Sequence, residues 1–296
     1  MEFLSEDRVR GLLRYEDLIP AMEQALADFS AGRIRQPVRS IVAIPEHDGQ
    51  WGIMPAVCGD VLGVKSVTVY EGNAARGLPT HQATIELFRS TTGEPLVAMD
   101  GRLITEMRTA AVTAVAVHLL APPDARRLAI LGSGVQARAH AQALRMVRQF
   151  EEIRVWSRNP EHARRCADEI GARAMSAEDA VRGADVVVTL TYTFEPILRG
   201  AWLAPHAFVA AVGAIGPKRR ELDDEAMNAP VIVDSRAAAE VESGDILLSG
   251  ARVHAELGEL LNGQPVPSGR VVFKSLGLAI EDVIAAKLVW DRHAAG

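Results

Sequence analysis

The stretch Leu128–Arg158 reads LAILGSGVQARAHAQALRMVRQFEEIRVWSR and carries the strongest fold signal in the chain. An apolar run enters the turn Gly132-Ser-Gly134, a helical pattern follows, and a second apolar run ends at Ser157. Because glycine has no Cβ, a pyrophosphate can approach the backbone, and the helix N-terminus faces that anion with free N–H groups. A glycine turn between a strand and a helix, with a second strand about 20 residues on, predicts a dinucleotide-binding unit. A glycine-rich turn in an ordinary α/β unit is the alternative.

The end of the second strand bears on which dinucleotide is bound. Sites that prefer NAD place an Asp or Glu there for the ribose 2′-hydroxyl, whereas an Arg suits a 2′-phosphate. This chain has no acid at that point and reads Trp156-Ser157-Arg158-Asn159. A hydroxyl, a guanidinium and an amide can all donate to a phosphate. We therefore favour NADP(H), with NAD(H) possible. The alternative for Arg158 is a solvated loop charge.

Composition limits the class of protein. The chain has 296 residues, of which 48% are hydrophobic and 24% charged, as is usual for a globular enzyme of one large or two medium domains. A net charge of −6 argues against nucleic acid as a partner. Two cysteines, Cys58 and Cys166, cannot form a disulfide framework or a metal cluster, and we expect no metal site. Without a basic signal segment or an apolar run of about 20 residues, we expect no membrane partner and a cytoplasmic protein.

The hydrophobic pattern changes three times along the chain. Residues 1–31 predict two helices, the second over Tyr15–Ser30, and residues 38–99 predict strands of an antiparallel or mixed sheet. A helix over Thr105–Leu120 ends at two prolines, and strands then alternate with helices. We therefore predict an α/β protein with a Rossmann-type doubly wound sheet and an α+β domain. A last amphipathic helix over Phe273–His293 would return to the first domain, giving domains 1–121 with 273–296, and 122–272.

Three cations in the first half are placed where chemistry rather than packing explains them. Lys65 lies inside an apolar strand, and strand alternation puts it on one face with Gly63 and Val67. A lysine buried in this way needs an anion or a lowered pKa; an edge-strand lysine is the alternative. Arg108 lies among small residues of a helix and can reach a carboxylate or phosphate, or remain on the surface. Arg39, at a strand start, is the least distinctive of the three.

Two further segments can contribute to a site. Pro79-Thr-His-Gln-Ala83 offers an imidazole or a hydroxyl, although a single histidine is more often structural. Phe273-Lys-Ser-Leu-Gly precedes a helix and offers an anion or nicotinamide contact, with a simple helix cap as the alternative.

Eight segments together resemble the ornithine cyclodeaminase/mu-crystallin family, from about residue 35 to 290, in family order and spacing. They are GVKSVTVYEGN, GLPTHQATIELF, GRLITEMRTAA, ILGSGVQAR, RELDDEAM, VDSRAAAEVESGD, HAELGELL and FKSLGLAIEDVIAAKL. The mu-crystallin branch, the ketimine reductases, is the more similar. The resemblance implies a homodimer, in which each subunit joins a substrate and dimerisation domain to a Rossmann domain with the active site in the cleft between them.

The resemblance also implies residue roles. Arg39, Lys65 and Arg108 would hold the α-carboxylate of a small-molecule substrate, and Lys65 would lie closest to the chemistry, as electrostatic anchor and proton donor. The implied cofactor contacts are Thr80 and Arg108; Val135 and Gln136 at the loop of Gly132 and Gly134; Ser157, Arg158 and Asn159 at the adenosine ribose; and Thr189, Val212, Ser275 and Leu276 along the nicotinamide half.

One departure from the family pattern narrows the reaction. Cyclodeaminases carry an aspartate in the loop after the fifth strand, where this chain has Ile215. Isoleucine cannot handle amine protons, whereas hydride delivery to a cyclic C=N carbon needs no such base. We therefore expect NAD(P)H-dependent reduction of a cyclic ketimine 2-carboxylate, pyrroline-2-carboxylate or piperideine-2-carboxylate, to proline or pipecolate. The alternatives are an alanine-type amino-acid dehydrogenase, an ornithine cyclodeaminase, or a crystallin-like protein that binds NADPH without turnover.

Overall fold

A computed structural model describes residues 1–296, and the chain forms two compact units. Unit 1 comprises Met1–Thr109 with Gly277–Gly296, and unit 2 comprises Ala110–Leu276. The change from one unit to the other falls inside helix α3 (Arg102–Leu120), whereas the sequence placed it at residue 121.

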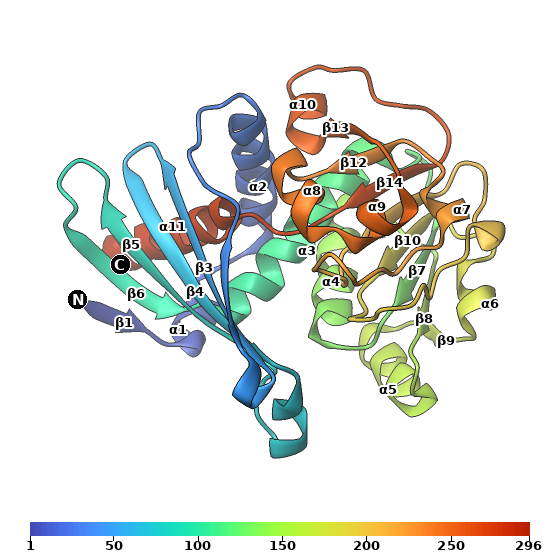
Figure 1. The fold of residues 1–296 in the computed structure, drawn as a ribbon, viewed down its shortest axis with the longest axis horizontal. Coiled ribbons are helices and arrows are strands. Elements are labelled where there is room, and N and C mark those ends of the chain that lie inside the picture. The colour runs from blue at the N-terminus through green and yellow to red at the C-terminus, as the bar shows by residue number, and fades with distance from the viewer. The chain divides into compact units, whose positions relative to one another are not determined.

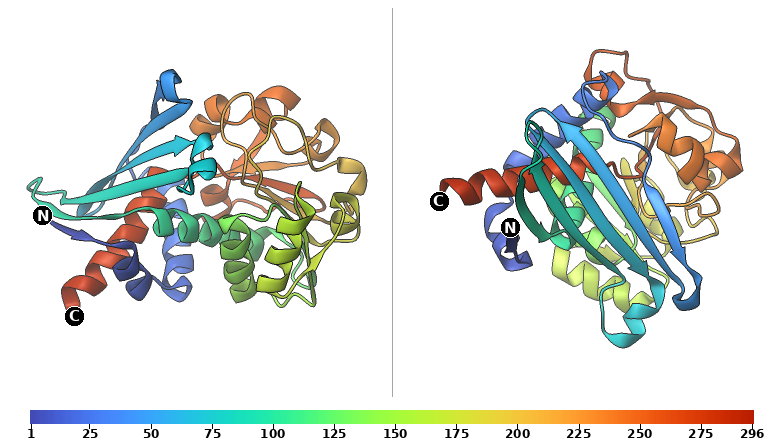
Figure 2. Two further views of the ribbon diagram at one scale, coloured as in Figure 1. Left: turned by 90° about the horizontal axis from the view of Figure 1, so that it is seen from below. Right: turned by 60° about the vertical axis from the view of Figure 1, so that its left-hand side comes forward.

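Unit 1 is an α+β unit built on one six-stranded sheet (Figure 1). Its strands lie in the order β1-β6-β5-β4-β3-β2, antiparallel except for the parallel pair β1–β6. The elements are β1 (Glu2–Leu4), α1 (Glu6–Leu12), α2 (Tyr15–Ser30), β2 (Ser40–Ile44), β3 (Gly49–Cys58), β4 (Val61–Tyr70), β5 (His81–Arg89), β6 (Pro95–Asp100) and α11 (Ala279–Ala295). Helix α11 packs against β3, β4, β5 and α2 and covers one face of the sheet (Figure 2).

Unit 2 is a doubly wound parallel sheet of eight strands, in the order β13-β12-β14-β11-β10-β7-β8-β9. The strands are β7 (Arg127–Leu131), β8 (Glu152–Trp156), β9 (Arg173–Ala174), β10 (Val186–Thr189), β11 (Phe208–Ala211), β12 (Val231–Val233), β13 (Val253–Glu256) and β14 (Val271–Lys274). The helices are α4 (Val135–Val147), α5 (Pro160–Ile170), α6 (Ala177–Val181), α7 (Asp224–Met227), α8 (Arg236–Glu242), α9 (Gly244–Ser249) and α10 (Leu257–Leu261). Every residue of β10, β11, β12 and β14 is buried, as expected of parallel strands covered on both faces. The predicted Rossmann-type sheet is confirmed.

The chain order of β7, β8 and β10 creates the binding edge of this sheet. From β7 the chain crosses first to β8 on one side and later to β10 on the other. Ligands of such sheets bind at this reversal, outside the carboxyl ends of the strands. The loops after β7, β8, β10 and β11 therefore meet where a dinucleotide is expected.

The predicted helix over Phe273–His293 is wrong at its beginning. Residues Val271–Lys274 form strand β14 inside the parallel sheet, and α11 begins only at Ala279. A short apolar run does not distinguish a buried strand from a buried helix. Between the two elements Gly277 has φ 77°, a conformation that favours glycine and separates strand from helix.

Helix α3 also departs from expectation. It begins three residues earlier than predicted, and by length and composition it is the one helix able to cross a membrane. However, 72% of its most apolar window is buried inside the protein, which is typical of a core helix.

Candidate active site

A buried charge cluster lies on the covered face of the unit 1 sheet. Lys65 is 1% exposed on β4, which lies between β3 and β5, so the edge-strand alternative is wrong. Its ammonium forms an ion pair with Asp282 of α11. Arg108 donates from Nε to Asp282 Oδ1 at 3.0 Å and from Nη1 to Glu281 Oε2 at 2.5 Å. Both carboxylates are fully buried. The predicted partner anion of Lys65 is thus intramolecular, on a helix distant in sequence.

Two glycines, Gly63 and Gly277, make room for the close packing around this cluster. Gly63, two residues before Lys65, lets α11 approach, because a Cβ there would lie 2.9 Å from Val283 Cγ2. Gly277 lies against the Arg108 guanidinium, where any Cβ would collide. Half-buried Arg39 donates from Nη2 to the Gly277 carbonyl at 2.6 Å. The structure therefore brings all three predicted clamp cations together.

The cluster brings positive groups from three elements together. Lys65 and Arg108 lie against the carboxylates of Glu281 and Asp282, and Arg39 adjoins them at the Gly277 carbonyl. Burial lowers the pKa of Lys65 to about 8, with Arg108 adding to the effect and Asp282 opposing it. Burial would raise the pKa of Asp282, but Arg108 and Lys65 outweigh it and hold the pKa below its usual range. The cluster therefore suits a further anion, such as a substrate carboxylate.

His81 is the first residue of β5, and Thr80 directly precedes it. Burial, reinforced by Lys65 and Arg108, lowers the pKa of His81 to about 4, so its imidazole is neutral near pH 7. Thr80 is exposed, and its carbonyl accepts a hydrogen bond from Tyr70 N at 2.9 Å. The histidine is thus a neutral neighbour of the cations.

The glycine loop of unit 2 has the geometry of a phosphate cradle. Gly132 has φ 137°, and a Cβ there would lie 2.9 Å from Leu190 O, so only glycine fits. Around Gly134 a Cβ would meet open space, and no side chain caps the first turn of α4. Arg138 donates to the carbonyls of Ser133 and Gly134, at 3.0 and 3.1 Å, which holds the loop in place. The residues present fit a pyrophosphate at the α4 N-terminus.

Two buried oxygens near this loop lack a hydrogen-bond partner within the chain. They are Gln136 Oε1, in the first turn of α4, and Thr189 Oγ1, at the carboxyl end of β10. Buried polar atoms are rarely left unpaired, so such atoms mark a place where a ligand can contribute partners. Both residues were predicted cofactor contacts.

The other predicted cofactor residues differ in their exposure and in the hydrogen bonds that they form within unit 2. Ser157 accepts a hydrogen bond from Ser133 Oγ at 2.9 Å, and Arg158 is exposed. Asn159 is the N-cap of α5, because its amide oxygen accepts from Glu161 N at 2.9 Å. At the other side of the sheet, the residues that follow β11 and β14 are buried, namely Val212, Ser275 and Leu276. Asp234, the residue after β12, accepts a hydrogen bond from Leu276 N at 2.6 Å. This bond connects the carboxyl ends of β12 and β14.

Several charged residues of these sites were not predicted. Glu281 and Asp282 are adjacent acids inside the apolar run that forms α11. Two acids in such a run stand out, so the sequence alone could have indicated that they are functional. Glu221, in a loop of unit 2, and Asp245, in the first turn of α9, carry no comparable signal. The alternative of a helix cap at Phe273-Lys-Ser-Leu-Gly is wrong, because the side chain that serves the first turn of α11 is Gln36, whose Oε1 accepts from Ile280 N at 2.8 Å.

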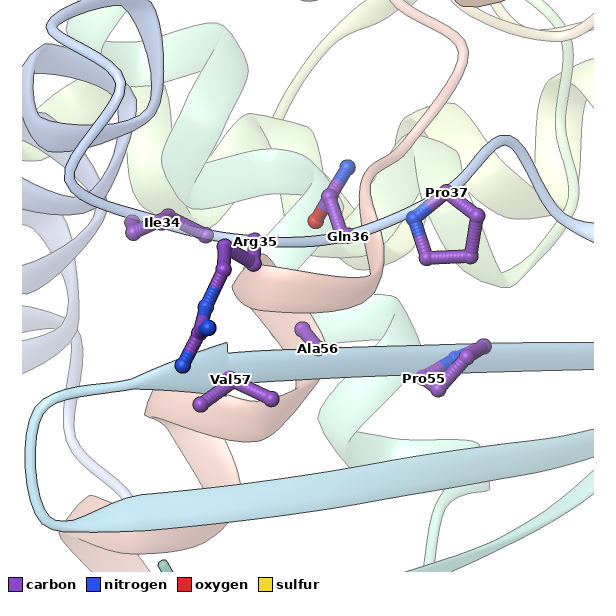
Figure 3. Close-up of a pocket in the computed structure, with 7 residues that line it drawn as sticks. All are labelled: Ile34, Arg35, Gln36, Pro37, Pro55, Ala56 and Val57. Atoms are coloured by element: carbon purple, nitrogen blue, oxygen red, sulfur yellow. The ribbon is translucent and has the colours of Figure 1, made fainter.

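A pocket of about 660 Å³ opens elsewhere on unit 1 (Figure 3). The segment Ile34–Pro37 runs beside β3 there, with Arg35 N donating to Val57 O and Val57 N donating to Arg35 O. None of the predicted site residues lines this pocket. Its lining includes Gln36, whose side chain accepts from Ile280 N in the first turn of α11.

Comparison with known proteins identifies the family of this chain. The chain matches the Ornithine cyclodeaminase/mu-crystallin family over residues 1–296. It is 47% identical to the ketimine reductase mu-crystallin of Mus musculus, over 99% of this chain and 98% of that protein. The fold resembles the structure of Thermococcus litoralis Delta(1)-pyrroline-2-carboxylate reductase in complex with NADH and L-proline, with TM-score 0.94, 33% identity and coverage of 100% and 98%. It also resembles an archaeal alanine dehydrogenase dimer with bound NAD, with TM-score 0.94, 29% identity and coverage of 100% and 96%. The chain belongs to the ornithine cyclodeaminase/mu-crystallin family.

Proposed function

We propose that this protein is an oxidoreductase that reduces a cyclic ketimine 2-carboxylate to the cyclic amino acid with a nicotinamide nucleotide. Pyrroline-2-carboxylate would give proline, and piperideine-2-carboxylate would give pipecolate. The ketimine reductase and the pyrroline-2-carboxylate reductase similar to this chain support the reaction class. The observation that carries the proposal is the cluster in which Lys65 and Arg108, both buried, meet Arg39 on the covered face of the unit 1 sheet.

The chain's own residues bind, orient and protonate the substrate. Lys65, Arg108 and Arg39 would hold the ring carboxylate, which restricts the imine carbon to one orientation. The reduced nicotinamide, when bound, supplies a hydride to that carbon. The ring nitrogen gains a proton, and Lys65 would donate that proton or act as the electrostatic anchor of the ring carboxylate. A pKa of about 8 suits an acid that works near neutral pH.

We assign the cofactor to unit 2 and the substrate carboxylate to unit 1. Gly132, Gly134, Val135 and Gln136 would hold the pyrophosphate at the α4 N-terminus. The remaining predicted cofactor residues, from Ser157 to Leu276, lie at the carboxyl edge of the same sheet. Ile215, in place of the aspartate of cyclodeaminases, packs against the apolar core of unit 2. An apolar side chain there favours imine reduction over amine deprotonation.

A substrate panel tests the reaction. NADPH and NADH oxidation would be followed with pyrroline-2-carboxylate, piperideine-2-carboxylate, and pyruvate plus ammonia, while L-ornithine plus NAD is assayed for ammonia release. We expect fast oxidation with a cyclic imine alone. Turnover of pyruvate only in the presence of ammonia would support an alanine-type dehydrogenase instead, as would be consistent with the similar archaeal enzyme. NADPH binding without any oxidation would support the crystallin-like alternative.

Carboxylate binding is expected to weaken as the pH rises through about 8. The pKa of Lys65 lies near that value because burial lowers it, so the ammonium loses its proton and the cluster loses one positive charge. The inhibition constant of pyrrole-2-carboxylate, whose ring nitrogen does not titrate there, would rise across this range. In Lys65→Arg the rise should move to higher pH, since a guanidinium stays charged. A flat profile in the wild type would contradict the role of Lys65.

Arg158 is expected to discriminate between the two cofactors. Its exposed guanidinium can donate to a 2′-phosphate, whereas the 2′-hydroxyl of NADH gains little from it. Arg158→Ala should raise the Kd of NADPH roughly tenfold and leave that of NADH unchanged, by titration calorimetry. Arg164→Ala, which removes another exposed arginine, is the matched control. Equal effects on both nucleotides would refute the NADPH preference assigned to Arg158.

We also propose that the protein is a homodimer formed through the uncovered face of the unit 1 sheet. That face carries mainly apolar side chains that are half-buried or exposed in the single chain, namely Trp51, Ile53, Pro55, Val57, Leu62, Val64 and Phe88. A contiguous apolar face of this kind is typical of an interaction surface, and the similar alanine dehydrogenase is a dimer. Sedimentation equilibrium tests this: a monomer at micromolar concentration would refute it. The cytoplasmic location remains a prediction.

A further inference from the structure

The turn after β11, Val212–Gly216, is hydrogen-bonded to a buried network of charged side chains within unit 2. This network has no part in the proposed reaction. This turn lies at the carboxyl edge of the sheet, next to the end of β10. Ligands of doubly wound sheets bind at that edge. The inference developed here rests on the proposed function, because it concerns how the turn is presented to the nicotinamide and the imine.

Glu221 joins two neighbouring loops through its carboxylate. It is fully buried and accepts hydrogen bonds from Thr191 N at 2.6 Å and Thr191 Oγ1 at 2.8 Å, after β10. Its other oxygen accepts from Gly213 N at 2.7 Å and Ala214 N at 3.1 Å, in the turn. Burial raises the pKa of Glu221, and Lys274 counteracts that rise. With four donors aimed at it, the side chain is bound as an acceptor on both oxygens.

Lys274 holds the same turn from its carbonyl side. It is fully buried at the end of β14, and its Nζ donates to Ala214 O at 2.6 Å. Glu221 thus binds the N–H of Ala214 while Lys274 binds its carbonyl. With both polar groups of one residue engaged by buried charges, the turn has little freedom to rotate a peptide plane.

Asp245 completes the network. Its Oδ2 lies 3.1 Å from Lys274 Nζ, and its Oδ1 accepts from Glu221 N at 2.8 Å and Leu222 N at 3.0 Å. Gly213 shows how tight the fit is, because a Cβ there would lie 2.1 Å from Thr191 N. The network has a single cation, Lys274, between two carboxylates.

We propose that Lys274 is a positioning residue, which holds the turn after β11 through Ala214 O so that Val212 and Ile215 keep one conformation at the nicotinamide end of the site. A purely electrostatic role, the neutralisation of Asp245, makes a different prediction. If Lys274 only balances the charge of Asp245, a variant that lacks both charges should recover wild-type hydrogen exchange and turnover. If Lys274 acts through Ala214 O, that variant should recover neither.

Three variants separate these roles: Lys274→Met, Asp245→Asn, and the double variant. Asparagine keeps an oxygen for Glu221 N and Leu222 N, but its Nδ2 faces Lys274 Nζ, so Asp245→Asn alone reports the loss of the ion pair with Lys274. The first readout is amide hydrogen exchange of peptides that cover Val212–Ile215, with peptides of the Gly132 loop as internal control. We expect faster exchange in the turn for the double variant and no change at the Gly132 loop. Wild-type exchange in the double variant would overturn the proposal, even if Lys274→Met alone fails to fold.

The second readout is kinetic. For the double variant we expect kcat for the imine to fall roughly 100-fold, because small misplacements at a reacting centre have effects of that size. Binding of 2′,5′-ADP, which occupies only the adenosine half, should be unchanged within about twofold. Lys287→Met, a substitution of a lysine on the outer part of α11, is the matched control. Recovery of kcat in the double variant would overturn the positioning role. If the wild type reduces no imine, the proposed function fails, while the exchange experiment still decides the role of Lys274.

Discussion

Lys65→Met is expected to lower the turnover of the cyclic imine by roughly 10³-fold while NADPH binds with nearly wild-type affinity. The substitution removes the central ammonium of the cluster and leaves Asp282 paired only with Arg108. One positive charge is lost, so the substrate carboxylate loses an ionic partner. The glycine loop belongs to unit 2 and does not depend on Lys65. Steady-state kinetics and nucleotide titration measure the two effects.

The kinetic constants distinguish what Lys65 contributes. Loss of an anchor raises KM and the inhibition constant of pyrrole-2-carboxylate, whereas loss of a proton donor lowers kcat. We expect both changes. The melting temperature must be recorded alongside, because Lys65 is buried, and Lys287→Met again provides the control. Near-wild-type kcat/KM in a folded Lys65→Met variant would show that Lys65 has no role in the reaction.

Arg108→Ala is expected to lower the free energy of unfolding by about 3–5 kcal/mol, a large part of the stability of an ordinary domain. Its guanidinium is the partner of two fully buried carboxylates, Glu281 and Asp282. Without it Glu281 loses its cation, and Asp282 keeps only Lys65. Urea denaturation followed by hydrogen exchange of α11 peptides reports on unit 1 selectively.

Two comparisons test the cause of this destabilisation. Arg108→Ala combined with Glu281→Gln should recover part of the loss, because one of the unpaired charges is then absent. Arg164→Ala, which breaks an exposed pair, should leave stability unchanged. The pKa of Asp282 is held low by Arg108 and Lys65, so the wild type loses this stabilisation as the pH falls through the carboxyl range. The difference between wild type and Arg108→Ala should therefore shrink in acid. An effect no larger than that of Arg164→Ala would contradict the assignment.

Local features of the chain were predictable. The helix over Tyr15–Ser30 has the predicted bounds. The face of Lys65 followed from alternation, because Gly63 and Val67 are buried with it. These features depend on neighbours a few residues apart. The short run Val271–Lys274 was misassigned because its strand identity depends on β11 and β12, which flank it in the sheet.

The sequence was sufficient for the glycine loop, the strand–helix alternation and the presence of three unusual cations, since each is written in residues close together along the chain. Only the tertiary structure shows what those cations pair with. Arg108 and Asp282 are 174 residues apart, and Glu221 and Thr191 are 30 residues apart. Whether a buried charge is compensated depends on which side chains the fold brings within a few ångströms and on how much water it removes from them. Those two quantities follow from packing, so the ion pairs of Lys65 and Arg108 and the hydrogen bond from Lys274 to the turn became visible only in three dimensions.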